Sequence, residues 1–144
     1  MLKNINFSEA RAQLSPIFDQ VLNDQQPIIV KRKRDEAFII KCELQKQILS
    51  NYNLNVEEMP EDDGSMTLAI HQLAIVVNQK TLPEAIEDLI SELKIYAEEY
   101  MNRLQLFLNA PNRKGHLPYT LRILMCESDK EIAEMLVFEN ATKI

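Results

Sequence analysis

A long helical pattern in the second half of the chain is the feature that most constrains the fold. Thr81, followed three residues later by Glu84, predicts a helix start with a capping box. Two interleaved heptad series and several further apolar residues then form one broad stripe. Its members are Leu82, Ile86, Leu89, Ile90, Leu93, Tyr96, Ala97, Tyr100, Met101, Leu104, Phe107 and Leu108. A stripe this broad predicts a helix packed on a sheet and on further helices, rather than a two-stranded coiled coil.

Short apolar runs on both sides of this helix complete the second half. Residues 66–70 and 74–77 predict short strands, as a hairpin or as one bent strand, and residues 110–119 are a turn-rich connector. Helices are expected near residues 120–126 and 129–137. The chain has only 2 glycines in 144 residues, which argues against an all-β protein rich in tight turns. An α+β fold follows.

An acidic stretch, residues 53–65, precedes the strand pair and has few apolar residues. We expect it to hold the domain boundary, with an acidic linker at 56–65 between domains at 1–55 and 66–144. The charge of the chain is uneven, because residues 1–48 contain eight Lys and Arg against six Asp and Glu, whereas residues 49–144 contain eight against sixteen. A mildly basic N-terminal part and an acidic C-terminal part suggest two different partners.

The first 52 residues predict a three-stranded sheet with helices. Strands are expected at 2–5, 28–32 and 37–40, and a helix at 43–52. Ser8 is the expected N-cap of a helix from Glu9, and Ser15 with Pro16 predicts a second helix start.

Basic residues in this part are candidates for contact with DNA. Arg11 lies in the first helical turn beside the capped start, where a phosphate or a guanine edge could meet its guanidinium. Residues 31–34 (Lys31, Arg32, Lys33 and Arg34) form the only dense basic run, and a phosphate backbone would relieve their mutual repulsion. The alternatives are an ordinary capped surface helix and a solvated hairpin tip.

The run "INFSEARAQLS", followed by "PIIVKR" and "AFII", resembles the N-terminal domain of the Phd/YefM antitoxins of bacterial toxin–antitoxin systems. The resemblance implies a dimeric DNA-binding domain in which Ser8 and Arg11 match the helix that meets DNA and Arg32 matches the hairpin arginine. Lys31, Lys33 and Arg34 are added to this DNA-binding set from their charge alone. The family usually has an Asn-Gly-type hairpin turn, whereas residues 33–36 contain no glycine, so we expect a longer or differently wound loop.

The second half carries a weaker resemblance. The segment around "NQKTLPEAIEDL" is similar to the strand-to-helix unit of HicB-type antitoxins and to helical domains appended to other antitoxins. A mainly helical domain with a short strand pair is therefore expected to bind the toxin. Its free apolar surface would be offered by Ile132, Met135 and Leu136, unless these residues only close the core.

Several function classes lack support in the sequence. Cys42 and Cys126 stand apart without metal-ligand spacing, and His71 and His116 have no recognisable catalytic partners. No glycine loop suited to phosphate binding, signal peptide or apolar run of bilayer length occurs. We therefore expect a cytoplasmic protein that is not an enzyme and uses no metal or cofactor.

Taken together, the residues and the resemblance imply an antitoxin. It would repress its own operon as a homodimer or higher oligomer on operator DNA. It would also neutralise a small basic toxin, often a translation-inhibiting ribonuclease. The alternative is a dimeric adaptor that does not bind DNA and whose acidic C-terminal domain binds another protein. Operator binding would separate the two.

Overall fold

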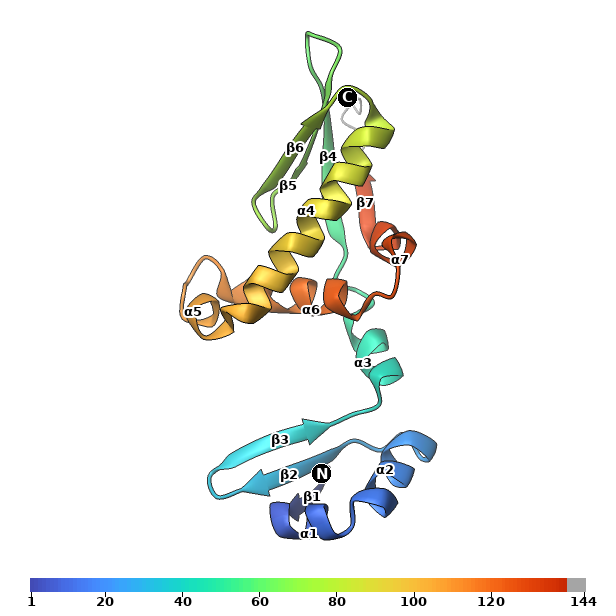
Figure 1. Ribbon diagram of the computed structural model, residues 1–144, viewed down its shortest axis with the longest axis vertical. Helices are drawn as coiled ribbons and strands as arrows, with labels where there is room; N and C mark the ends of the chain where they lie inside the picture. Colours follow the sequence, from blue (N-terminus) through green and yellow to red (C-terminus); the bar gives the residue numbers. More distant parts are fainter. Residues whose placement is uncertain (140–144) are drawn as a thin grey trace. The chain divides into compact units, whose positions relative to one another are not determined.

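The computed structural model describes residues 1–139 and confirms the α+β class. The chain divides into two compact units, with the boundary between Ile48 and Leu49. Each unit has its own sheet (Figure 1). Each also has its own hydrophobic core.

The first unit is a three-stranded sheet with two short helices. Its elements are β1 (Lys3–Asn6), α1 (Phe7–Ala12), α2 (Leu14–Asn23), β2 (Ile28–Arg32) and β3 (Asp35–Ile39), and α3 (Cys42–Leu49) follows. The strand order is β1-β2-β3, with β1 parallel to β2 and β2 antiparallel to β3. The strands and helices expected from the sequence are therefore present.

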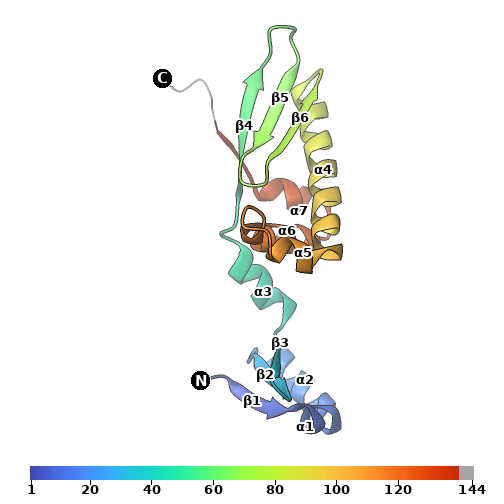
Figure 2. The ribbon, with the colours of Figure 1, turned by 90° about the vertical axis from the view of Figure 1, so that its left-hand side faces the viewer.

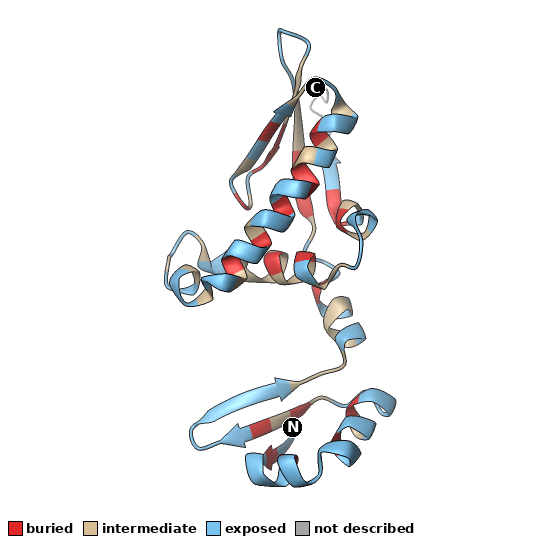
Figure 3. Ribbon diagram, viewed as in Figure 1, coloured by how far each residue is buried: buried red, intermediate tan, exposed pale blue. Residues whose placement is uncertain are grey.

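The core of the first unit lies between the sheet and the two helices (Figure 3). It consists of Ile5, Ala10, Ile17, Val21, Ile28 and Val30. The expected helix start at Ser15 is wrong, because α2 begins at Leu14 and Pro16 is its third residue. Proline is tolerated there because the first four N–H groups of a helix have no partner inside the helix.

The second unit contains four strands and several helices. Its elements are β4 (Leu54–Pro60), β5 (Met66–Ile70), β6 (Ile75–Gln79), α4 (Leu82–Asn102), α5 (Leu104–Leu108), a 3-10 turn η1 (Lys114–His116), α6 (Leu117–Met125), α7 (Asp129–Glu134) and β7 (Leu136–Glu139). The strand order is β6-β5-β4-β7, in which only the β4–β7 pair is parallel.

The expected acidic linker at 56–65 is wrong, because most of it belongs to this sheet. Leu54 and Val56 of β4 are fully buried, and residues 57–60 pair with β5. Residues 61–65 form the turn between the two strands. Leu54 and Val56 alternate with Asn55 and Glu57, so in this part of β4 one face enters the core while the other keeps polar side chains accessible.

Helix α4 confirms the prediction from the apolar stripe. Thr81 caps it by accepting a hydrogen bond from the N–H of Glu84 at 3.3 Å. Leu89, Leu93 and Tyr100 are fully buried. The helix covers one face of the sheet (Figure 2). It ends at Asn102, so the last part of the stripe belongs to the separate helix α5.

The C-terminal segment differs from the expected helix over 129–137. Helix α7 ends at Glu134, and β7 then pairs with β4 in a register that places Leu136 beside Leu54. The second unit therefore holds a four-stranded sheet rather than a strand pair. No helix within residues 1–139 is long and apolar enough to cross a membrane.

We predict that Leu54→Ala lowers the free energy of unfolding of the second unit by about 2–5 kcal/mol, because it leaves a cavity under the central strand. Leu106→Ala is the matched control. Leu106 is 54% exposed, so its truncation should cost less than about 0.5 kcal/mol. Urea denaturation followed by circular dichroism measures both. If both substitutions lowered the free energy of unfolding by the same small amount, this result would contradict the conclusion that β4 lies at the centre of the core.

Candidate nucleic-acid interface

Parallel pairing of β1 and β2 brings two of the predicted DNA-binding segments together. Asn6, the last residue of β1, pairs with Lys31 near the end of β2. Helix α1 starts at the next residue, Phe7. The start of α1 and the basic end of β2 therefore lie beside each other at one edge of the first unit.

The start of α1 is capped by Asn6 rather than by Ser8. The Asn6 side chain accepts a hydrogen bond from the N–H of Glu9 at 2.8 Å. Ser8 is an exposed residue of the first turn, so the predicted N-cap is wrong. Asn6 precedes Glu9 by three residues, which is the spacing of a capping box, and the helix therefore starts two residues earlier than expected.

Arg32 packs against α1. Its guanidinium lies 4.6 Å from the ring centroid of Phe7, a cation–π geometry. Phe7 is itself 40% exposed, so this contact is on the surface. Arg11 follows Phe7 by four residues, and residues at this spacing share one side of a helix. Arg11, Phe7 and Arg32 therefore form one exposed group with two guanidinium charges.

The hairpin turn next to this group is shorter than expected. Arg32 pairs with Asp35, so Lys33 and Arg34 are the two turn residues. Of the two expected alternatives, the longer loop is therefore wrong. Lys33 has a positive φ of 58°, whereas Arg34 does not, and an Asn-Gly-type turn has positive φ at both positions, so the turn is differently wound, as expected. The turn exposes both cationic side chains.

Lys31 is separated from the other basic residues by strand alternation. Its ammonium lies 3.8 Å from the carboxylate of Glu36 on β3, so the two opposite charges form a surface ion pair. Val30 and Arg32 belong to the helix-covered face, whereas Lys31 lies on the opposite face. All five cations among the six candidates are exposed, but Lys31 is paired and lies on the opposite face, so Arg11, Arg32, Lys33 and Arg34 remain for one interface, to which Ser8 adds a hydroxyl.

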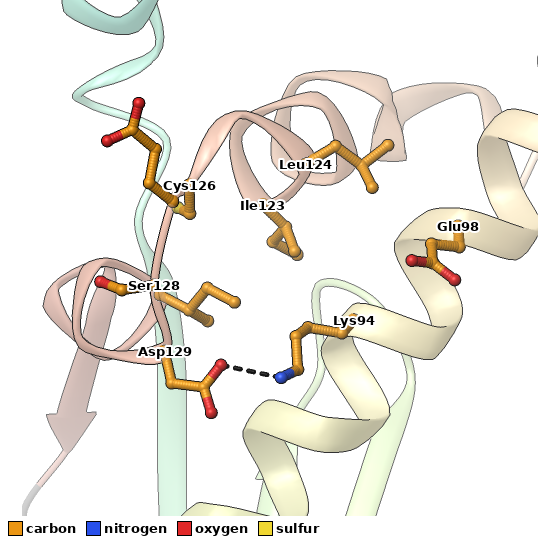
Figure 4. Close-up of a pocket in the computed structure, with 9 residues that line it drawn as sticks. Lys94, Glu98, Ile123, Leu124, Cys126, Ser128 and Asp129 are labelled. Atoms are coloured by element: carbon orange, nitrogen blue, oxygen red, sulfur yellow. Dashed lines mark hydrogen bonds and ion pairs between the residues drawn. The ribbon is translucent and has the colours of Figure 1, made fainter.

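The residues predicted to contact the toxin are not at the surface. Ile132, Met135 and Leu136 are all buried in the core of the second unit. Ile132 borders a pocket of about 260 Å³ that also involves Lys94 of α4 and Asp129 of α7, whose side chains bond at 2.8 Å (Figure 4). The prediction is wrong, because the three apolar residues close the core where β7 joins the sheet.

Comparison with known proteins decides the family. A family model, PHD_like, described as antitoxin of toxin-antitoxin, RelE / RelB, TA system, matches residues 1–138. The chain belongs to this antitoxin family. The antitoxin is also similar to a crystal structure described as the antitoxin part of an inferred toxin/antitoxin system from Syntrophomonas wolfei subsp. wolfei. The two sequences are 35% identical, the alignment covers 96% of this chain and 99% of the other, and the TM-score is 0.88. No curated protein matches the chain.

Proposed function

We propose that this antitoxin binds operator DNA through its first unit and thereby represses its own operon, as Phd/YefM-type antitoxins do. The observation that carries the proposal is the exposed group of Arg32, Phe7 and Arg11 beside the Lys33–Arg34 turn. Guanidinium groups bind phosphates and guanine edges in a bidentate manner. The contact with Phe7 restricts Arg32 before DNA arrives, so less side-chain entropy is lost on binding.

Arg11→Ala and Arg32→Ala should each weaken binding to the promoter region upstream of the antitoxin gene by about 1–3 kcal/mol if these residues contact bases. Each removed phosphate contact should also reduce the slope of log affinity against log salt by about one. Fluorescence anisotropy with a labelled promoter duplex measures both quantities.

Arg103→Ala is the matched control for this experiment. Arg103 belongs to the second unit and pairs on the surface with Glu99, so the substitution removes the same charge away from the proposed interface. Its affinity should equal that of the unmodified antitoxin. Unchanged binding by the Arg11→Ala/Arg32→Ala double variant would refute operator recognition and favour the adaptor that does not bind DNA.

We propose that the first unit also forms a homodimer through the uncovered face of its sheet. Phe38 is 50% exposed there, and Ile29 pairs with it on the neighbouring strand. The charges of this face compensate each other, because Lys31 pairs with Glu36. Two copies can therefore meet without repulsion. A unit of 48 residues with a core of only six residues also gains stability from burying this face.

Phe38→Glu should convert the dimer to a monomer in sedimentation equilibrium, because it places a carboxylate in the apolar contact. Phe18→Glu is the control, since Phe18 is 43% exposed but lies on α2 on the other side of the sheet. A dimer that survives Phe38→Glu and dissociates with Phe18→Glu would place the contact on α2 instead.

We propose that the second unit neutralises a cognate toxin, a small basic protein that inhibits translation as a ribonuclease, by binding and without catalysis. The acidic excess of residues 49–144 supports this assignment, because complementary charge speeds encounter with a basic protein. Both proteins would act in the cytoplasm. Expression of the protein encoded by the neighbouring reading frame should stop growth, and co-expression of the antitoxin should restore it.

A further inference from the structure

The face of the second sheet opposite α4 is uncovered in the described part of the chain (Figure 2). Strand register identifies its residues, because Val76 pairs with Ala69, Ala69 with Glu57, and Glu57 with Glu139. These four residues form one row across the sheet. Side chains alternate between the two faces of a sheet, so every second residue of each strand, counted from this row, lies on the same face. The open face consists of Asn55, Glu57, Met59, Thr67, Ala69, Val76, Asn78, Val137 and Glu139, of which Ala69 is buried beneath its neighbours and the others are at least partly exposed.

Two carboxylates of the open face stand side by side. Glu57 and Glu139 occupy paired positions on β4 and β7, and like charges directly opposite each other destabilise a sheet. The imidazole of His71 lies 2.6 Å from the Glu57 carboxylate. None of the strand residues that form the open face is Lys or Arg. A cationic group from another molecule would relieve this repulsion.

The β4–β5 turn extends the acidic surface and is held by hydrogen bonds. The N–H of Glu61 donates to the carbonyl of Ser65 at 2.9 Å, and Gly64 supplies the positive φ of 87° that the turn requires. Hydrogen bonds from the side chain and backbone of Ser65 lower the pKa of Asp63, which keeps its carboxylate charged. The acidic turn is therefore preorganised rather than a flexible linker.

Asn78 joins this turn to the open face. Its side-chain amide donates to the hydroxyls of Ser65 at 3.0 Å and Thr67 at 2.9 Å. A shallow hollow of about 520 Å³ lies at this junction. It is lined by Glu61, Asp62, Asp63, Ser65, Thr67 and Asn78. The hollow offers three carboxylates and no cation, which suits an arginine or lysine side chain of a partner.

We propose that the open face is the toxin-binding surface and that it receives a basic surface of the toxin; this rests on the proposed function. The exposed valines, Val76 at 64% and Val137 at 45%, supply apolar contact at the two edges of the face. Glu57, Glu139 and the acidic turn supply the complementary charge. A second copy of the antitoxin does not fit, because two acidic faces repel each other.

The test compares two double variants of the full chain with the same change in net charge. Glu57→Lys/Glu139→Lys reverses the charge of the open face. Glu87→Lys/Glu92→Lys makes the same change at two exposed positions of α4. A third variant, Val76→Lys, changes an exposed residue of the open face that makes no core contact and so tests the face without risk to folding. The probe is the protein encoded by the neighbouring reading frame, used in calorimetric titration and in growth rescue, with circular dichroism to confirm folding.

We expect the Glu57/Glu139 variant to lose at least tenfold in affinity, Val76→Lys to lose several-fold, and the α4 variant to stay within threefold of the unmodified antitoxin. Unchanged affinity in both open-face variants would overturn the surface, and so would an equal loss in the α4 variant, since only net charge would then matter. If the Glu57/Glu139 variant unfolds, Val76→Lys alone decides between these results. If the unmodified antitoxin neither binds the probe nor rescues growth, the proposed function is overturned instead. The assignment of the neighbouring gene product as its partner is then overturned as well.

Discussion

The pairing of β4 with both β5 and β7 is the interaction on which the second unit depends. It joins residue 54 to residue 136 and therefore ties the two ends of the unit into one sheet. Leu54 and Val56 then lie under α4 at the centre of the core. The same pairing aligns Glu57 with Glu139 on the other face. Core formation and the acidic open face thus follow from one strand, whose alternate residues serve the two purposes.

A parallel pair also organises the first unit. Because β1 runs beside β2, the start of α1 lies next to the end of β2, and residues 25 positions apart, Phe7 and Arg32, come into contact. The two sheets differ in the charge of their uncovered faces. The first face is neutralised by the Lys31–Glu36 pair, which suits a second copy, whereas the second has adjacent carboxylates and suits a basic partner.

Strong periodicity made part of this structure predictable from the sequence. The stripe of α4, its Thr81 cap and the β5–β6 strand pair were expected because many residues contribute to each pattern. Strand β4 was missed because its glutamates resemble a solvated linker and only Leu54 and Val56 show the alternation. Strand β7 was missed because its pairing with β4 is non-local, and a short apolar run after a helix does not reveal it.

The candidate DNA-binding residues were predictable for a different reason. Arg11 and the run at 31–34 stood out by charge, but their arrangement depended on the β1–β2 register and on the conformation of Lys33. Phe7, which holds Arg32, had no signal of its own in the sequence. The three apolar residues expected to meet the toxin were misplaced, because β7 turns the last apolar segment towards the core.

Hydrogen–deuterium exchange of the full chain tests most directly whether the two units bind two different partners. Exchange should be compared for the free antitoxin, for its complex with the promoter duplex and for its complex with the neighbouring gene product. The duplex should slow exchange in α1 and around the Lys33–Arg34 turn, whereas the protein partner should slow exchange in the strands of the second sheet. Protection of the first unit by both partners, with the second sheet unaffected, would contradict the division of function between the two units.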